Sequence, residues 1–447
     1  MGKRILFIGL VFLSLLPVKG FVVCAQDAEQ TQKDTLRYGT DNEIAELIKT
    51  IRNDKINYLD DDLLSLVKTS KNENVVKGIL SLFIEREKKG AEDAALKILS
   101  NRDNENASIV ISAVDYLGAV KENSAVDELN AIVANDDDRF MVYAVRSLGK
   151  IAGAENSGIK DDICASLLNY YENHSPSNDR KREIILSLGS TGSSKAAPLL
   201  KEIITNNDEN TMFRTAALEA AAKIKDGDFL GTVIEASSSP DANIRAAAIK
   251  SLGTFDGEQS DNAILDAFRD SFFRTRLAAA NAAGARKMTA AIPFLRYRAE
   301  RDDAQSVREE SVKALGLIDH DDSNDVLTAI LNNKASTEKI RILSAEMLLK
   351  NNADKYCQSI IEKADEAKGK KQTTFYQGLL RALSTAKTNK LEVLTARFFA
   401  SKDVIEKAFA IEFTANNSFS QFKEELEKIS KEKNTLSSKA VDALSKL

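Results

Sequence analysis

A six-residue pattern that returns every 30 to 40 residues limits what this chain can fold into more than any other feature of its sequence. In the clearest copies, at 113–118, 144–149, 248–253 and 311–316, a small residue stands five positions before a marker glycine. Aliphatic residues stand four and one positions before the glycine, which gives one apolar face of a helix. With weaker copies, the markers are Phe83, Gly118, Gly149, Gly189, Ala222, Gly253, Gly284, Gly316, Leu349, Ser384, Ala415 and Ser445. This period predicts a solenoid of stacked helical pairs.

A second amphipathic stretch follows the pattern, for example at 262–268 and 325–330, so each unit is expected to be a helical hairpin. The marker glycine is expected to end its helix or to weaken it locally. The chain has only 5 Pro, 20 Gly and no Trp in 447 residues, so the turn residues of an all-β protein are missing. We predict an all-α fold, a right-handed α-α superhelix of about twelve helical hairpins over residues 41–447, with a half-unit at 42–53. The widest marker interval predicts a longer loop around 171–180.

Residues 1–25 have the layout of a secretory signal peptide. Lys3 and Arg4 precede an apolar run at 5–16, which is short for a membrane span. We expect cleavage after Ala25, with Gly20 as an earlier alternative, and a secreted or periplasmic protein.

Cys24 leaves a lipoprotein open as an alternative, because such signals are cut just before a cysteine that is then acylated. Lipidation at Cys24 is the one route to a membrane that we consider. After the leader, residues 26–40 are polar and lack apolar periodicity, so they predict a flexible tether.

The charge of the chain argues against nucleic acid as a partner. Removal of three basic leader residues takes the formal net charge from −5 to −8. Cys164 and Cys357 lie too far apart in an elongated array to pair, so we predict two buried free thiols. The chain has two histidines, His174 and His320, and shows no nucleophile–base constellation. We therefore assign no catalytic residue, no cofactor and no metal site.

The repeats resemble the HEAT repeat, in the short variety first associated with phycobilisome lyases. The stretch 241–253 carries an aspartate, then Ile244-Arg245, then a small-residue run ending in Leu-Gly. The resemblance implies an α-solenoid that binds proteins. Some HEAT-type proteins are enzymes, but the repeated His-Glu pairs of deoxyhypusine hydroxylase are absent here, since Ser175 and Asp321 follow the two histidines.

An arginine stands eight positions before the marker in five units, at Arg214, Arg245, Arg276, Arg308 and Arg341, and Lys181 takes that position one unit earlier. This position lies at the edge of the apolar face, one helical turn from the core residue. We interpret the series as a structural ladder that pairs with a carboxylate such as Asp241 or with the backbone of the neighbouring repeat. An anion-binding surface is the alternative.

A basic island spans 269–301, where eight positive and two negative residues give a net charge of +6. Arginine combined with aromatic residues is typical of interaction hot spots. The predicted partner-binding residues are Arg274, Arg286, Lys287, Arg296, Arg298, Arg301, Phe272 and Phe273, and we expect the exposed ones to lie together. The other interpretation is that the aromatic rings belong to the core and the arginines to a solvated rim.

A second candidate surface is formed by the residues three positions before each marker, among them Arg146, Lys250 and Lys313, which should point away from the core. Their mixed charge suits a folded protein or a peptide. We expect an exported non-enzymatic scaffold that binds a protein partner in the bacterial envelope. The alternatives are an anchored lipoprotein that docks on anionic lipid or polysaccharide through the basic island, and a lyase-like enzyme.

Overall fold

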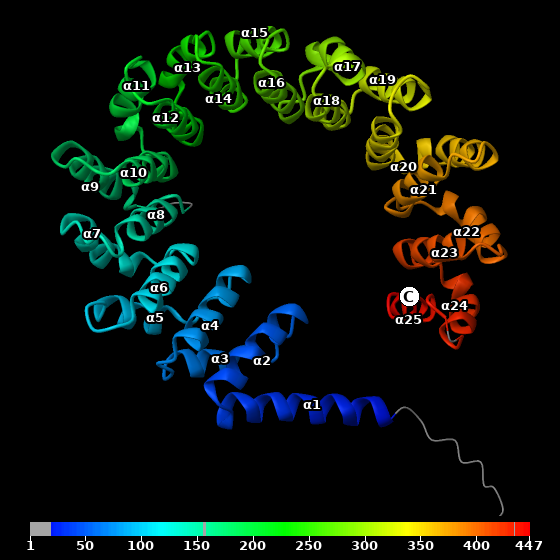
Figure 1. The fold of residues 1–447 in the computed structure, drawn as a ribbon, viewed down its shortest axis with the longest axis horizontal. Coiled ribbons are helices and arrows are strands. Elements are labelled where there is room, and N and C mark those ends of the chain that lie inside the picture. Colours follow the sequence, from blue (N-terminus) through cyan, green and yellow to red (C-terminus); the bar gives the residue numbers. More distant parts are fainter. Residues whose placement is uncertain (1–18, 155–157, 433) are drawn as a thin grey trace, which may run out of the picture. The chain divides into compact units, whose positions relative to one another are not determined.

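The computed structural model describes residues 19–154, 158–432 and 434–447, and every regular element in these ranges is a helix (Figure 1). The chain divides into two compact units, one up to Lys195 and one from Ala196 to Leu447. The predicted all-α fold is confirmed.

The α-helices of the first unit are α1 (Lys19–Tyr38), α2 (Asp41–Asn53), α3 (Asp60–Val67), α4 (Glu73–Glu85), α5 (Glu92–Ser100), α6 (Ala107–Ala119), α7 (Val126–Ala134), α8 (Met141–Ala152), α9 (Lys160–Asn173) and α10 (Asn178–Thr191). Those of the second unit are α11 (Ala197–Thr205), α12 (Thr211–Ile224), α13 (Leu230–Ala236), α14 (Ala242–Leu252), α15 (Glu258–Ala267), α16 (Phe273–Ala285), α17 (Ile292–Arg301), α18 (Gln305–Ile318), α19 (Asp321–Asn332), α20 (Glu338–Gly369), α21 (Thr373–Ser384), α22 (Glu392–Phe399), α23 (Val404–Asn417), α24 (Lys423–Ser430) and α25 (Ser437–Leu444). Single 3-10 turns are η1 (Asn123–Ala125), η2 (Ser194–Ala196), η3 (Gly227–Phe229), η4 (Thr289–Ala291), η5 (Asn389–Leu391) and η6 (Ser420–Phe422).

Successive helices form hairpins from α3 onward, and α2 is the predicted half-unit. Helix α20 counts as two helices because Asn352 leaves the helical conformation, with φ −153° and ψ 89°. The described residues therefore contain twelve hairpins, α3–α4 through α24–α25, as the repeat period predicted.

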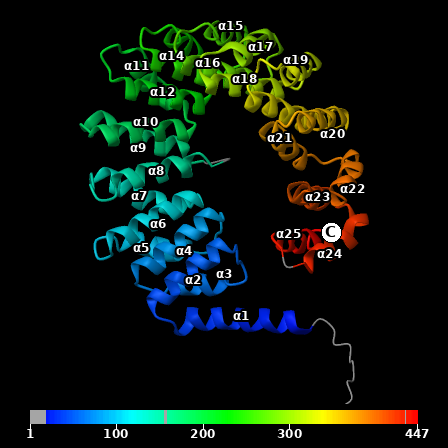
Figure 2. The same ribbon diagram turned by 45° about the vertical axis from the view of Figure 1, so that its right-hand side comes forward.

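Within each unit the helices form two layers (Figures 1 and 2). The helices that carry the markers pack side by side in one layer, which we call the marker layer, and their hairpin partners form the second layer. Several helices of the marker layer begin at a residue whose side chain accepts a backbone N–H two positions on, such as Asn106 in α6 and Asp241 in α14. These caps fix where the helices start.

The marker glycines serve the contact between neighbouring marker helices, and only Gly253 lies at a helix end as expected. Gly118 and Gly284 lie inside α6 and α16. A Cβ on Gly118 would lie 2.5 Å from the hydroxyl oxygen of Ser147 on the next marker helix. Ser147 in turn donates a hydrogen bond of 2.9 Å to the carbonyl of Val114. These glycines thus lie in the last turn of their helices, one residue before the end in α6 and α16, and the close approach of the next helix leaves no room for a side chain there.

The segment expected to be a flexible tether is helical. Residues 26–38 belong to α1, Leu36 is buried, and the Tyr58 hydroxyl donates a hydrogen bond of 2.5 Å to Oε1 of Gln32. Among residues 28–38, whose burial the structure describes, Leu36 is the one buried side chain, so this part of the helix lacks the apolar periodicity of an ordinary amphipathic helix and the sequence pattern missed it. The basic and apolar parts of the leader, at 3–4 and 5–16, lie outside the described residues.

The expected loop at 171–180 is also mostly helix. Helix α9 extends to Asn173 and α10 begins at Asn178, so only four residues connect them. The Tyr170 ring stacks on His174 with centroids 4.3 Å apart, and the Tyr170 hydroxyl donates a hydrogen bond of 2.5 Å to Asp136. These contacts hold the extra residues in a longer α9.

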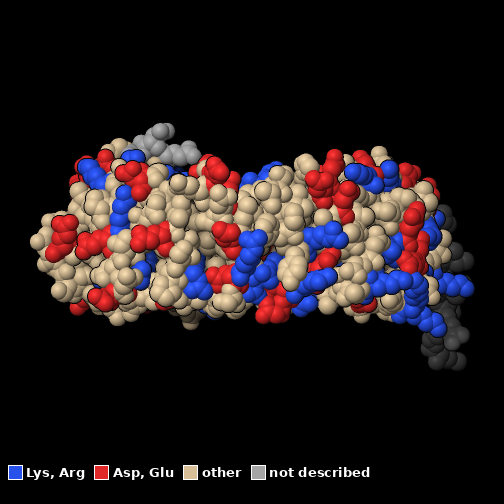
Figure 3. Space-filling model, turned by 90° about the horizontal axis from the view of Figure 1, so that it is seen from above, with Lys and Arg blue, Asp and Glu red and all other residues tan. Residues whose placement is uncertain are grey.

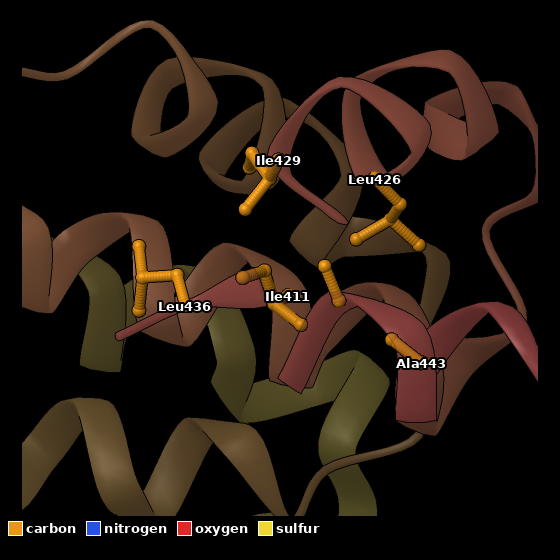
Figure 4. Packing of buried hydrophobic residues seen from close by; sticks show 6 residues of the cluster. Ile411, Leu426, Ile429, Leu436 and Ala443 are labelled. Carbon is orange, nitrogen blue, oxygen red and sulfur yellow. The ribbon is translucent and has the colours of Figure 1, made fainter. Parts of the chain in front are cut away.

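Each hairpin buries its apolar face against its neighbours, as the last described hairpins show (Figure 4). Ile411 of α23 packs there with Leu426 and Ile429 of α24 and with residues of α25. Cys164 and Cys357 are buried free thiols, as predicted.

Candidate functional site

A pocket of about 420 Å³ opens on the second layer between the end of α15 and helix α17. Its lining is made of aromatic rings, guanidinium groups and one proline: Phe268, Arg269, Pro293, Phe294, Tyr297 and Arg298. We call it the Arg–aromatic pocket. Tyr297 is 53% exposed, so its ring gives the pocket an open apolar surface that a partner side chain can contact.

The pocket is shaped by contacts among its own lining residues. Phe268 is buried and its ring stacks on Phe294, with centroids 5.6 Å apart. The Arg269 guanidinium lies 5.0 Å from the Phe294 centroid. Arg298 lies 5.3 Å from the Tyr297 centroid and donates a hydrogen bond to the carbonyl of Phe268. Cation–π contacts therefore hold the two guanidinium groups against the rings.

The predicted partner-binding residues do not all lie together. Phe272, Phe273 and Arg274 stand at the start of α16, where Arg274 lies 5.8 Å from each ring centroid. Arg286 and Lys287 follow the end of the same helix. Arg286 follows Arg274 by twelve positions, a helical rise of about 18 Å. The expectation of one cluster was wrong, because the residues occupy opposite ends of α16.

Two of the predicted binding arginines, Arg286 and Arg298, are mostly buried and pair with other residues of the chain. The Arg286 side chain is 12% exposed, forms an ion pair with Asp261 and donates a hydrogen bond of 2.7 Å to Oγ of Ser260. The Arg298 side chain is 19% exposed and its Nη1 lies 3.3 Å from Oδ2 of Asp302. Neither fits the expectation of an exposed arginine.

The remaining basic residues of α17 fit that expectation. Arg296 is exposed, with Nε 3.5 Å from Oε1 of Glu300. Arg301 is exposed beside Tyr297, with its guanidinium 5.9 Å from the ring centroid.

Sequence reasoning placed Arg269, Phe294 and Tyr297 in the basic island but left them out of the binding set. A signal for two of them was present, because Phe294 and Tyr297 are three residues apart and so share a face of α17. Phe268 and Pro293 had no such signal. Their place in the pocket depends on α15 and α17 lying side by side.

The arginine ladder has a structural role at its centre. Arg245 forms two bonds to the carboxylate of Asp270, and Arg276 forms two to Asp302, each aspartate belonging to the following hairpin. Asp241, the partner suggested from sequence, instead caps α14. Burial would raise the pKa of Asp302, but the hydrogen bonds from Arg276 and the Ala304 N–H outweigh it and hold this pKa below its usual range.

Within the described residues, Arg308 and Arg341, later in the ladder, lack the paired aspartate that Arg245 and Arg276 have. The Arg341 Nε donates a hydrogen bond of 2.9 Å to the Leu331 carbonyl, and its guanidinium lies 3.9 Å from the Phe375 centroid. Burial lowers the pKa of Arg341. The Arg308 Nε is buried without a hydrogen-bond partner among the residues that the structure describes.

From Asp115 to Asp442, the residues three before each marker are exposed or half-buried, as expected, whereas Leu80, three before the first marker Phe83, is buried. Arg146 holds Glu183 of the next marker helix with N–O distances of 3.1 and 3.2 Å. Burial raises the pKa of Asp115 and of Glu346. Acidic and basic side chains are also interspersed on the face shown in Figure 3, so charge there is mixed rather than uniform.

The histidines have local structural roles. His174 stacks on Tyr170, and His320 accepts the Asp322 N–H at the start of α19. Within the described ranges, no three histidine, cysteine or acidic side chains gather in a way that could hold a metal ion. Over the same ranges, no helix combines the length and apolar content needed to cross a bilayer.

The hairpin stack, the glycine contacts and the Arg–Asp ladder define an α-solenoid protein of the HEAT class. The chain belongs to the spirochaete HEAT repeat protein family, whose model matches residues 36–443. The resemblance to HEAT repeats inferred from the sequence is thereby confirmed. No curated protein matches the chain in sequence.

The chain is also similar to solved structures. Yeast importin-beta (Kap95p) is 12% identical with a TM-score of 0.52, and the match covers 94% of this chain and 65% of the importin. The complex of CpcE and CpcF of phycocyanin lyase from Nostoc is 20% identical with a TM-score of 0.37, over 54% of this chain and 94% of that chain. At this identity the importin likeness shows the fold alone.

Proposed function

We propose that this chain is an exported, non-enzymatic HEAT-repeat scaffold that binds a protein partner at the bacterial envelope. The HEAT fold suits protein interaction, since stacked repeats present long surfaces. The signal-like residues 1–25 support export. The observation that carries the proposal is the Arg–aromatic pocket.

The chemistry of that pocket favours binding over catalysis. Its lining holds two guanidinium groups and three aromatic rings, with no carboxylate, thiol, imidazole, serine or threonine, and the Tyr297 hydroxyl has no base beside it in the lining. Such a lining suits an acidic segment of a protein that inserts an apolar side chain beside Tyr297. A concave pocket favours a protein segment over the flat surface of a lipid bilayer.

Site-specific photo-crosslinking tests the pocket. Tyr297 of the full chain is replaced by a photo-reactive amino acid in the cells that make the protein. Val393 of α22 is the matched control, since it lies in the same layer and is 81% exposed. We expect one discrete protein adduct at 297 and none at 393. Equal adducts at both positions would contradict the proposed site, and lipid adducts alone would favour the lipoprotein alternative.

Mass spectrometry of the native N-terminus tests export independently. A chain that begins at Gln26 supports a soluble exported protein, and an acylated Cys24 supports the anchored form. An uncleaved leader on the mature protein in the cytoplasm would contradict export.

A further inference from the structure

The loops that precede three successive marker helices share one hydrogen-bonding position. Asp270 accepts the backbone N–H of the residue two positions later at 2.7 Å, and Asp302 does so at 2.9 Å. Ser239 occupies the same position, since its hydroxyl oxygen accepts the Asp241 N–H at 3.2 Å. In addition, Arg245 donates to the carbonyl of Ser239 as Arg276 donates to that of Asp270. Ser239, Asp270 and Asp302 are therefore equivalent.

Each of the two aspartates in this set accepts two hydrogen bonds from the guanidinium of a ladder arginine that lies about one repeat earlier in the chain. Arg245 and Asp270 are joined by N–O distances of 2.7 and 3.0 Å, and Arg276 and Asp302 by two of 2.7 Å. A guanidinium presents parallel N–H groups that match the two oxygens of a carboxylate. The ladder geometry in this part of the chain is thus that of a carboxylate receptor.

Arg214, like Arg308 and Arg341, is a ladder arginine for which the structure shows no paired aspartate. It stands eight positions before its marker, as Arg245 and Arg276 do, and the equivalent of their aspartates is Ser239, which has no carboxylate. Arg214 is 8% exposed and its Nε donates a hydrogen bond of 3.0 Å to the Ile204 carbonyl. Its two outer nitrogens form no hydrogen bond or ion pair within the described residues.

Arg214 lines a pocket of about 250 Å³ formed by the ends of α11 and α13 and the loops that follow them. Thr205, Asn207, Thr232 and Ser238 add polar groups to its lining. Glu235 is the one carboxylate there, but it is exposed and forms no ion pair with Arg214. A buried guanidinium without a counter-charge is costly, so the pocket favours an anion.

We propose that the Arg214 pocket binds a carboxylate, which takes the place that Asp270 holds on Arg245. The carboxylate belongs either to an acidic residue of a protein partner or to a free organic acid. This inference is independent of the Arg–aromatic pocket, which lies on other helices of the same unit.

The test follows the Nε–Hε NMR signal of Arg214 in full chain labelled with ¹⁵N-arginine, assigned with Arg214→Lys. We expect sodium acetate to shift this signal in a saturable way, and sodium chloride at equal ionic strength to leave it in place. The capped peptides acetyl-Gly-Glu-Gly-amide and acetyl-Gly-Gln-Gly-amide form the second arm. Tighter binding of the Glu peptide than of acetate identifies a polypeptide source, and equal binding identifies a free acid.

Ser239→Asp is the decisive variant, because it supplies the missing aspartate from within the chain. It should raise the melting temperature, move the Arg214 signal without ligand and weaken acetate binding by at least about tenfold. Glu235→Gln is the control and should keep the acetate response.

Asp270→Ser makes the reverse change and should let acetate raise the melting temperature more than in the wild type. A wild-type Arg214 signal that responds equally to acetate and chloride would overturn the proposal. So would an acetate response that survives Ser239→Asp unchanged.

Discussion

Arg276 and Asp302 form a buried ion pair, in which the Arg276 side chain is 5% exposed and the Asp302 side chain 0% exposed. The pair joins α16 to the loop after α17, so it connects one hairpin to the next. Asp303 also contacts Arg276 but is 87% exposed. The two neighbouring aspartates thus differ in burial and in the number of bonds that they accept, since Asp302 also accepts from Arg298 and from the Ala304 N–H.

Asp302→Asn should lower the free energy of unfolding by about 3 kcal/mol, because it removes the buried counter-charge of Arg276 and leaves only the exposed Asp303 beside it. Asp303→Asn is the matched control and should cost less than about 1 kcal/mol, as exposed ion pairs do. Urea unfolding of both variants at pH 7 measures the difference. Equal losses would show that burial does not set the strength of this pair.

Stability should also fall in acid. The pKa values of Asp270 and Asp302 lie below their usual range in the folded protein, since hydrogen bonds from Arg245 and Arg276 outweigh the burial that would raise them. The unfolded chain therefore takes up protons first. The stabilisation is fully present above the ordinary aspartate pKa of about 4 and is lost as pH falls through the lowered folded values. Urea midpoints from pH 7 to pH 3 should show this fall, and Asp302→Asn should make it shallower.

Gly284→Ala should destabilise the second unit by about 1–3 kcal/mol, because the new Cβ would lie 2.8 Å from the Cα of Ala314. Gly231→Ala is the matched control in α13, where a Cβ meets no atom within 4 Å. Its greater helix propensity should stabilise that helix by up to about 1 kcal/mol. Thermal unfolding of the two variants measures both effects. An unchanged melting temperature for Gly284→Ala would contradict the close approach of α16 and α18.

Reversal of charge on α17 should separate a surface arginine from a structural one. Arg298→Glu should lower the melting temperature, because it removes the hydrogen bond to Phe268 and places a second carboxylate beside Asp302. Arg296→Glu should leave the melting temperature near that of the wild type, since the Arg296 side chain is 57% exposed. If Arg298→Glu melts like Arg296→Glu, Arg298 is free to bind a partner.

Cys164 and Cys357 should resist thiol reagents in the native protein. Burial raises the pKa of both thiols, that of Cys357 to about 11, so little thiolate forms at pH 8. The measurement is labelling of a Cys24→Ser chain with a disulfide reagent, before and after denaturation in urea. Rapid labelling of the native chain would mean that the hairpins open locally.

The sequence predicted what depends on local periodicity and missed what depends on contacts between hairpins. The repeat pattern predicted the hairpins because core positions recur at helical spacing. It did not predict that Arg286 would pair with Asp261, since that contact joins residues of different helices. The partner of Arg245 could have been found, because Asp270 and Asp302 follow their arginines by nearly equal intervals once the repeats are aligned.

Helix α1 gives the polar stretch at 26–38 a different meaning. A stack of hairpins ends in an apolar face, and two such faces on separate molecules would stick together end to end. Because α1 packs on α2 and α3, its polar side chains cover that end with a surface that water can solvate. The polar composition that predicted a flexible tether at 26–38 is also the composition that a helix needs when one of its faces is open to water. A chain shortened to begin at Asp41 would lose this cover and should self-associate as its concentration rises.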